Sequence, residues 1–390
     1  MPGPLDGVLV ADFSRVLAGP YATMLLADLG ATVVKVERPG PGDDTRAWGP
    51  PFADDGQSTY FQSVNRSKLS IALDLGDDDD RAMAQELAAC ADVLVENYKP
   101  GGLAKYGLDF SRVSDGNPGV VYCSISGFGS SGGADLPGYD LLVQAMGGLM
   151  SITGTQEPTK AGVAVVDVLT GLHATVGILA ALRHRDATGE GQHLEVTLLG
   201  ALQSALVNQA SGFVGAGFVP TYLGNAHPSI SPYEVYATLD RPIVIAVGND
   251  GQFRHLVRVL GIPAIADDPR FVGNSDRVAH RAQLTEVLEQ ALLARGADEW
   301  QSLLTAAGVP CGPINDIAQG FALADRLGLD PIVVVDDPRR PGPARQVANP
   351  VRFSGTPVQY RSAPSFVDED RGEVVRVLRD RSRQVKDGAS

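Results

Sequence analysis

Segments with the length and apolar content of buried strands alternate with helical patterns over the first half of the chain. The expected order is a strand at 8–13 (VLVADF), a helix from near Pro20 to 30, a strand at 31–37, a helix around 81–91, strands at 92–97 and 119–126, and a long helix after Asp167. Apolar strands separated by helices predict a parallel sheet covered on both faces. We therefore expect an α/β fold.

Ligands of such open sheets bind beyond the carboxyl ends of the strands. The loops SRVLAGP, ERPGPGD, ENYKPG and SGFGSSGG follow four expected strands, and Asp167 follows a fifth apolar run, VAVV. Basic residues recur in these loops and just beyond them, namely Arg15, Arg38, Arg46, Lys99 and Lys105. Their recurrence at one edge of the sheet indicates a ligand that carries phosphate.

A second block, roughly residues 225–325, has a different character. The segment 232–250 (PYEVYATLDRPIVIAVGND) predicts a hairpin, and helical patterns follow around 251–261 and 281–296. The proline-rich segment 337–365 cannot supply central strands, because proline removes donors from the ladder. We expect it to run irregularly over the surface or between domains.

Composition excludes several classes of protein. A formal net charge of −14 argues against nonspecific binding of nucleic acid, which needs a broad basic face. Three widely spaced cysteines, Cys90, Cys123 and Cys311, predict neither disulfides nor a zinc framework. No apolar run reaches the length of a membrane span, and the N-terminus lacks the features of a signal peptide, so we expect a cytoplasmic protein. A length of 390 residues predicts two domains, or one large domain with an insertion.

Two glycine-rich segments match known sequence motifs but do not predict the functions of those motifs. GFGSSG, residues 127–132, fits a dinucleotide fingerprint, and GSSGG would make Ser131 a hydrolase nucleophile. Both motifs require a helix to open at once, whereas Pro137 interrupts the segment that follows. A permissive glycine turn is the simpler interpretation. None of the six histidines has the spacing of a metal site.

Asp167 has two compatible interpretations. An aspartate before a long helix is a good N-cap, because its side-chain oxygen accepts hydrogen bonds from the first turn. The dipole of that helix would also keep the carboxylate ionised, and an ionised carboxylate is a covalent nucleophile in several enzymes. His173, six residues further along the helix, is expected to be packed or on the surface.

Longer segments carry a family resemblance. The N-terminal segments 12–46 (DFSRVLAGPYATMLLADLGATVVKVERPGPGDDTR), 65–75 (NRSKLSIALDL) and 92–109 (DVLVENYKPGGLAKYGLD) resemble the family III CoA transferases, which include formyl-CoA and carnitine CoA-transferases. The segments GNAHPSISPYEVY, DDPRFVGNSDRVAHRAQL and AGVPCGPIND are similar to C-terminal blocks of that family. The resemblance reaches about residue 357, and APSFVDEDRGEVV replaces the usual closing segment.

The resemblance implies a reaction and a nucleophile. Asp167 stands at the position of the family's catalytic aspartate, which attacks the thioester of an acyl-CoA to give a mixed anhydride and then an aspartyl-CoA thioester. A free carboxylic acid then takes up the CoA. The resemblance thus implies an acyl-CoA donor and a carboxylic acid acceptor as substrates and no permanently bound cofactor. Backbone N–H groups at a helix N-terminus would stabilise the oxyanions.

The resemblance also carries over a set of CoA contacts. They are Val16, Leu17 and Ala18 at the thiol end, Arg38 at the adenine and phosphate end, Leu73 and Asp74 on the neighbouring wall, Asn97, Tyr98, Lys99 and Lys105, and the pair Tyr139 and Asp140 near the nucleophile. Arg15, from the first loop, completes the expected binding residues.

Three positions depart from formyl-CoA transferase. Pro137 replaces a lysine that contacts CoA there, Leu17 replaces a glutamine that touches the small acid, and the glycine-rich flap is absent before PYEVY. Leu17 and the apolar HPSI segment therefore favour a medium-sized or aromatic acid over formate or oxalate. By analogy with related enzymes, the donor is expected to be succinyl-CoA.

The family's fold implies a doubly wound, mostly parallel, Rossmann-like large domain, a smaller α+β domain and an interlocked homodimer. We assign residues 1–200 to the large domain, 201–225 to a linker, 226–325 to the small domain, 326–350 to a second linker and 351–390 to a return into the large domain.

Two other functions remain open on this scaffold. An acyl-CoA racemase needs an acid and a base on opposite faces of the α-carbon. Family racemases carry a histidine where this chain has Tyr139, and glycines where it has Val168 and Leu169. A CoA-binding protein without turnover is the second alternative, and retention of Asp167 beside the thiol-end loop counts against it.

Overall fold

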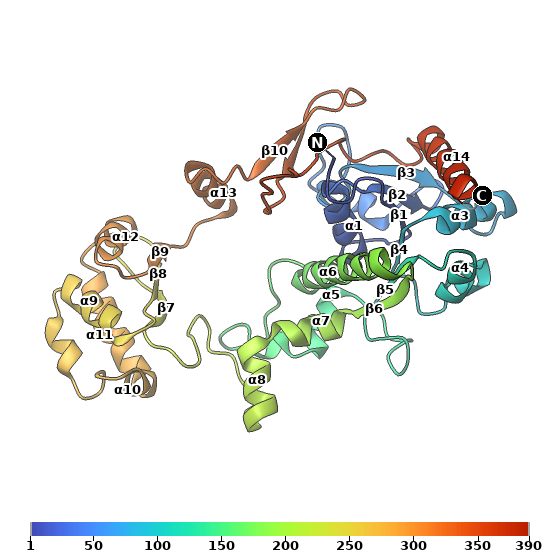
Figure 1. Ribbon diagram of the computed structural model, residues 1–390. Helices are drawn as coiled ribbons and strands as arrows, with labels where there is room; N and C mark the ends of the chain where they lie inside the picture. Colours follow the sequence, from blue (N-terminus) through green and yellow to red (C-terminus); the bar gives the residue numbers. More distant parts are fainter. Residues whose placement is uncertain (1, 389–390) are drawn as a thin grey trace. The chain divides into compact units, whose positions relative to one another are not determined.

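The computed structural model describes residues 2–388, which form two compact units. The larger unit contains the chain up to Leu149, Ala161–Val219 and the chain from Asp330 onward, whereas the smaller unit contains Met150–Lys160 and Pro220–Leu329. Figure 1 labels most of the helices and strands of both units. The chain therefore leaves the larger unit and returns to it twice.

Six parallel strands form the central sheet of the larger unit, in the order β3-β2-β1-β4-β5-β6. They are β1 (Leu9–Asp12), β2 (Thr32–Glu37), β3 (Lys68–Ala72), β4 (Val93–Glu96), β5 (Val121–Ser126) and β6 (Gln192–Thr197). This is the order of a Rossmann-type sheet, whose direction of winding reverses between β1 and β4. The expected parallel α/β sheet is confirmed.

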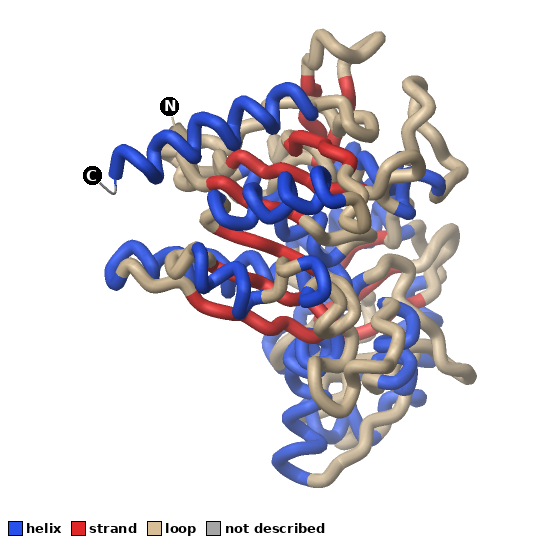
Figure 2. Tube along the Cα trace, turned by 90° about the vertical axis from the view of Figure 1, so that its right-hand side faces the viewer, coloured by secondary structure: helices blue, strands red, loops and turns tan. Residues whose placement is uncertain are grey.

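Helices cover both faces of this sheet (Figure 2). The helices of the larger unit are α1 (Ala18–Asp28), α2 (Thr59–Gln62), α3 (Asp78–Cys90), α4 (Phe110–Gly116), α5 (Asp140–Met146), α6 (Val165–Thr188), α7 (Leu198–Ala205), α8 (Val207–Ala216) and α14 (Arg371–Gly388). Short 3₁₀ helices lie at η1 (Asp44–Ala47), η2 (Ala104–Tyr106) and η3 (Leu149–Ser151).

Two apolar clusters form the core, one on each face of the sheet. One cluster joins α1, α5, α6 and α7 to side chains such as Val10, Val33 and Val121. The other joins α3, α4 and α14 to side chains such as Leu9, Val34 and Leu94. Successive residues of a strand point to opposite faces. A strand buried on both sides therefore reads as a continuous apolar run, which is why these segments were predictable.

The smaller unit contains a three-stranded antiparallel sheet with the order β7-β8-β9. Its elements are β7 (Tyr233–Tyr236), β8 (Ile243–Ala246), α9 (Asp250–Val259), η4 (Pro263–Asp267), α10 (Asn274–Ala279), α11 (Arg281–Leu292), α12 (Ala297–Ala306), β9 (Cys311–Pro313) and α13 (Ile317–Arg326). The predicted hairpin and the two helical patterns are confirmed. A core of its own, which includes Tyr236, Phe253 and Trp300, holds the unit together.

Three local expectations are wrong. The run VAVV before Asp167 is not a strand, because α6 already begins at Val165. The stretch from 201, expected to be irregular, is helical as far as Ala216, since α7 and α8 continue an apolar pattern after the Thr197 cap. The stretch 326–350 contains an antiparallel pair, β10 (Ile332–Val335) and β11 (Ala344–Val347), whose prolines lie in the connecting turn and remove no ladder donor.

Helix α6 has the length and apolar composition of a membrane span and is the only described helix that does. One side of it is buried in the core, where Ala174, Ile178 and Leu182 pack against α1 and the sheet. Core helices of soluble proteins share this composition, so the feature is weak evidence for a membrane. The three cysteines are free, and Cys123 is fully buried.

Candidate active site

A cavity of about 470 Å³ opens beyond the carboxyl ends of β1, β4 and β5. This is the point where the winding of the sheet reverses and where ligands of open α/β sheets bind. Many of the expected site residues line it: Arg15, Val16, Leu17, Ala18, Asn97, Tyr98, Lys99, Tyr139 and Asp167. Segments far apart in sequence therefore form one site, all within the larger unit.

Asp167 does not cap the helix that follows it. It is the third residue of α6, whose N-cap position is Ala164, without a side-chain cap. Asp140 performs the capping instead, because its Oδ1 accepts hydrogen bonds from the N–H groups of Val166 at 2.8 Å and Asp167 at 3.2 Å. Gln144 donates to the other oxygen of Asp140 at 2.6 Å and fixes that carboxylate. The carboxylate of Asp167 is thereby left available to the cavity.

The electrostatic surroundings of Asp167 also differ from the expectation. Burial and the nearby negative charge of Asp140 raise the pKa of Asp167 to about 7. The expected effect of the helix dipole, which favours the ionised form, is outweighed by desolvation and like-charge repulsion. Asp167 is consequently about half ionised near neutral pH. A carboxylate with a raised pKa is more basic and is typical of a catalytic group.

Apolar and aromatic side chains lie near Asp167. Tyr60, Val16, Ala164 and Val168 pack in one small cluster with the buried Leu17. Burial, together with the negative charge of Asp167, raises the pKa of Tyr60 to about 12, so its hydroxyl stays protonated. A dry wall of this kind strengthens electrostatic interactions at the carboxylate.

The loop at the thiol end has a strained backbone. Val16 has φ of +70°, which is a genuine outlier for a β-branched residue. Its N–H donates to Asp43 Oδ2 at 3.2 Å, and Asp43 is itself buried against Lys35 at 2.9 Å. Burial acts to raise the pKa of Asp43, but Lys35 and hydrogen bonds from Thr45 lower it to about 2.

Asn97 holds the same loop from the other side. Its Oδ1 accepts from the N–H of Arg15 at 2.9 Å, and its Nδ2 donates to the carbonyl of Arg15 at 2.7 Å. Asn97 follows β4 directly, whereas Arg15 follows β1. The two loops that meet at the reversal point are thus locked together, which maintains the strain at Val16.

The first turn of α1 has backbone N–H groups without acceptors in the described chain. Its N-cap, Leu17, makes no side-chain cap, and the N–H groups of Ala18 and Gly19 have no acceptor within residues 2–388. Unsatisfied N–H groups at a helix N-terminus carry partial positive charge. Ala18 lines the cavity together with Asp167. These donors are suited to an oxyanion that develops beside the nucleophile.

Basic groups gather at the rim. The guanidinium of Arg15 binds Asp44 at 3.2 Å and lies over the ring of Tyr98, 5.6 Å from its centroid. Arg38, which does not line the cavity, binds the other oxygen of Asp44 at 2.5 Å. Lys99 binds Asp135 at 2.7 Å across the mouth of the cavity. Binding of phosphate by these three cations remains a prediction.

Three expected residues lie elsewhere. Leu73 is buried in the core beneath α3, so its side chain faces away from solvent. Asp74 is exposed and accepts a hydrogen bond from the N–H of Gly76 within its own turn. Lys105 is exposed, with its ammonium 4.6 Å from the ring centroid of Tyr106. Contacts from these residues to a ligand remain predictions.

The glycine-rich segment behaves as a turn. A Cβ on Gly127 would lie 2.4 Å from the Cα of Gly138, so the two ends of loop 127–138 touch only because both residues are glycine. Between the end of β5 at Ser126 and the start of α5 at Asp140, a stretch that the structure describes throughout, no helix begins. The described structure thus lacks a helix directly after the glycine-rich segment, which both the dinucleotide-binding motif and the hydrolase motif require.

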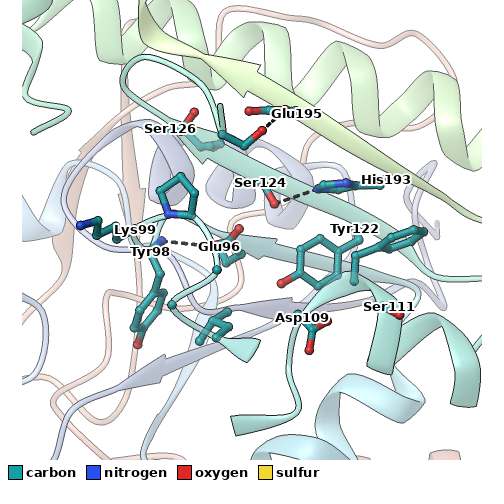
Figure 3. A pocket seen from close by; sticks show the side chains of 17 residues that line it. Glu96, Tyr98, Lys99, Asp109, Ser111, Tyr122, Ser124, Ser126, His193 and Glu195 are labelled. Carbon is teal, nitrogen blue, oxygen red and sulfur yellow. Dashed lines mark hydrogen bonds between the residues drawn. The ribbon is translucent and has the colours of Figure 1, made fainter. Parts of the chain in front are cut away.

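A neighbouring cavity of about 250 Å³ contains a serine and a histidine (Figure 3). The hydroxyl of Ser124 lies 2.9 Å from Nε2 of His193, whose ring stacks on Phe110. Burial raises the pKa of Glu96, whose Oε2 accepts a hydrogen bond from the N–H of Tyr98 at 2.8 Å. Within residues 2–388, His193 has no hydrogen bond to a carboxylate, which the order of a hydrolase triad requires.

Metal chemistry has no support in the described chain. Residues 2–388 contain no group of three or more histidine, cysteine, aspartate or glutamate side chains that could hold a metal ion. The exposed His173 binds the carbonyl of Leu169 within its own helix, with Nδ1 and O 2.8 Å apart. It lies on the surface, as expected.

Comparison with known protein families identifies the family of this chain. Residues 5–371 match the model of CoA-transferase family III. The chain belongs to CoA-transferase family III. Membership confirms the sequence resemblance and makes the chain an acyl-CoA:carboxylate CoA-transferase, with a CoA thioester and a free carboxylic acid as its substrates.

Characterised relatives cover nearly the whole chain. A succinate–glutarate CoA-transferase of Agrobacterium fabrum is 45% identical, over 96% of this chain and 96% of its own length. An acetyl-CoA:oxalate CoA-transferase of Acetobacter aceti is 40% identical, over 96% and 95%. A solved CaiB/BaiF family protein from Brucella suis superposes with a TM-score of 0.87 at 42% identity, over 97% of this chain and all of the other. The family III α/β fold is therefore confirmed.

Several residues of the site were not predicted. Asp43 accepts a hydrogen bond from the N–H of Val16, and Asp44 binds Arg15 at the rim of the cavity. Tyr60 lies near Asp167, and Gln144 donates a hydrogen bond to the capping carboxylate of Asp140. The adjacent acids Asp43 and Asp44 after the second strand were the available signal, since acidic residues among recurrent basic ones imply ion pairs. Nothing in the local sequence marks Tyr60 or Gln144.

Proposed function

We propose that this enzyme transfers CoA through covalent intermediates on Asp167, using an acyl-CoA of a dicarboxylic acid as donor and a free dicarboxylic acid as acceptor. The observation that carries the proposal is the carboxylate of Asp167 in the cavity, freed from capping by Asp140 and raised in pKa to about 7. A group used only to cap or pair would be engaged by a hydrogen-bond donor or a cation.

The proposed reaction passes through anhydride and thioester intermediates on Asp167. An oxygen of Asp167 attacks the thioester carbonyl, the C–S bond breaks, and an acyl-aspartyl anhydride and the CoA thiolate form. The thiolate attacks the carbonyl of Asp167 and releases the donor acid, which leaves an aspartyl-CoA thioester. The acceptor carboxylate then attacks that thioester, the C–S bond breaks, and a second mixed anhydride and the CoA thiolate form. The thiolate attacks the acceptor's carbonyl carbon in this anhydride and expels the carboxylate of Asp167, which gives the new acyl-CoA and the free enzyme. The covalent route divides one difficult transfer into several easier steps.

The chain supplies stabilisation along this path. The N–H group of Ala18, which lines the cavity and has no acceptor within residues 2–388, would bind the oxyanion at the attacked carbonyl. The cluster of Tyr60, Val16 and Val168 excludes water from the anhydride, which would otherwise hydrolyse. Arg15, Arg38 and Lys99 are placed to bind the phosphates of CoA.

The names of two relatives support the proposed substrate class. The Agrobacterium enzyme is named for succinate and glutarate, and the Acetobacter enzyme for oxalate. Succinate, glutarate and oxalate are dicarboxylic acids, whereas the acetyl-CoA in the name of the Acetobacter enzyme is the thioester of a monocarboxylic acid. We therefore propose succinyl-CoA as donor and a short dicarboxylic acid such as glutarate as acceptor, in place of the medium-sized or aromatic acid that Leu17 favoured.

The test is intact-protein mass spectrometry after mixing the enzyme with succinyl-CoA, with and without hydroxylamine. We expect an adduct that hydroxylamine converts to a hydroxamate, located by peptide mapping at Asp167. The Asp167→Asn variant is the matched control and should form none. Binding of CoA with neither adduct nor transfer would favour the non-catalytic alternative, and exchange of the α-proton in heavy water without transfer would favour the racemase.

We also propose that the enzyme acts as an interlocked homodimer. Helix α8 and the residues after it expose a row of large apolar side chains: Val207, Phe213, Val214, Phe218 and Val219. Contiguous apolar surface of this kind usually marks an interface. We expect light scattering to give twice the chain mass of 40.9 kDa at micromolar concentration. A stable monomer would contradict the proposal.

A further inference from the structure

We infer that Asp44 occupies, in the free enzyme, the place that a phosphate of CoA takes between Arg15 and Arg38, so that CoA binding exchanges one anion for another. This inference rests on the proposed use of CoA by this site. It assigns to Asp44 the role of an internal competitor that sets the affinity for CoA.

The contacts of Asp44 carry the argument. Its two oxygens bind two different guanidinium groups, Oδ2 to Arg15 at 3.2 Å and Oδ1 to Arg38 at 2.5 Å. One anion bridging two arginines is also the arrangement by which proteins hold phosphate. Asp44 lines the cavity together with Arg15 and Asp167, so this bridge lies at the rim of the proposed active site.

The backbone and the guanidinium of Arg15 are held in place, but one of its donors has no partner. Its backbone is fixed by both hydrogen bonds to Asn97, and its guanidinium lies over Tyr98. Its Nε is nevertheless buried and has no hydrogen-bond partner in the described chain. A buried donor without a partner is costly. A phosphate with several oxygens can accept from Nε and from a terminal nitrogen at once, which one oxygen of Asp44 does not do.

The bridge is weak enough to exchange. The side chains of Arg38 and Asp44 are 51% and 42% exposed, and ion pairs at such exposure contribute little to stability. The neighbouring Asp43 differs, since it is buried, bound to Lys35 and used to hold Val16. Of the two adjacent acids, one is therefore structural and the other is exchangeable.

The test measures binding, independently of turnover. Isothermal titration of the full-length enzyme with CoA, 4′-phosphopantetheine and pantetheine compares the wild type with Asp44→Asn. We expect the variant to bind CoA about threefold to tenfold more tightly, because the competing charge is gone. Affinity for pantetheine, which has no phosphate, should not change, and 4′-phosphopantetheine shows which phosphate the arginines bind.

Two further variants control the experiment. Asp115→Asn removes the same charge from the exposed end of α4, outside the cavity, and should leave CoA affinity unchanged. Asp44→Ser should reproduce Asp44→Asn, which excludes an effect particular to the amide. Both proteins are first checked for a wild-type melting temperature.

The outcomes separate this inference from the proposed function. Unchanged or weaker CoA binding by both Asp44 variants would overturn it, since Asp44 would then only orient the arginines. A changed KM for glutarate with unchanged CoA affinity would also overturn it, because the arginine pair would then serve the acceptor acid. Failure of the wild type to bind CoA would overturn the proposed function itself.

Discussion

Replacing Asp167 by asparagine is expected to reduce transfer of CoA from succinyl-CoA to glutarate by roughly 10⁴-fold or more. The amide keeps the shape of the side chain but cannot attack a thioester and cannot form an anhydride. The contacts proposed for CoA, at Arg15, Arg38 and the backbone of Ala18, are not touched by the change. Initial rates by chromatography of the acyl-CoA products check the loss, and calorimetry checks that CoA still binds.

The control for this prediction is Asp115→Asn, which makes the same chemical change on the surface of α4 and should retain the wild-type rate. An Asp167→Asn enzyme that kept more than a few per cent of activity, after exclusion of deamidation by mass spectrometry, would contradict a covalent role. Equal loss of CoA binding and activity would instead assign Asp167 to substrate binding.

The apolar strands of the sheet were predictable, and two strands were not, for a physical reason. Strand β3 carries Lys68 and Ser70 in buried positions, where Lys68 donates to Asp12, to the carbonyl of Pro20 and to Asn65. Because lysine is usually a surface residue, the sequence alone does not indicate that Lys68 is buried and paired with Asp12, which is distant in the chain. Strand β6 lies at the edge of the sheet and alternates exposed with partly buried residues, so it lacks the continuous apolar run.

The candidate site was predictable as a set of loops but not as a set of charges. The rule that ligands bind beyond parallel strands pointed to Arg15 and Asn97, which line the cavity after β1 and β4. Asp167 lines the same cavity, although it lies in the first turn of α6 and the run before it is not a strand. The rule did not show that Asp140, distant in sequence, caps α6, nor that this frees Asp167 and raises its pKa. Such effects depend on distances between side chains from separate elements, which local patterns do not contain.

The strained loop and the raised pKa have a common feature. Val16 adopts a left-handed conformation only because Asp43 and Asn97 hold the loop, and Asp167 keeps a carboxylate in an apolar wall only because the surrounding fold is stable. Both features cost stability, and both lie at the cavity. Natural proteins retain such costs where function requires them.

The cost at Asp167 should be measurable as a dependence of stability on pH. Its pKa is about 7 in the folded enzyme against 3.8 for the ordinary side chain. Between these values the folded state binds more protons at this group than the unfolded state, so the free energy of unfolding falls as pH rises. Asp167→Asn removes this effect. The variant should gain about 2–3 kcal/mol over the wild type between about pH 5 and pH 8, allowing for partial exposure to the cavity.

Urea unfolding at matched protein concentration, without CoA, measures this difference at both pH values. Asp140→Asn is the informative companion, because its amide oxygen can still accept from Val166 while the negative charge beside Asp167 is lost. It should lower the pKa of Asp167 and so give a smaller decline of stability with pH than the wild type, although burial remains the larger cause. Parallel pH curves for wild type and Asp167→Asn would show that the pKa of Asp167 is not raised in the folded enzyme. Its nucleophilicity would then have to arise only on binding the acyl-CoA.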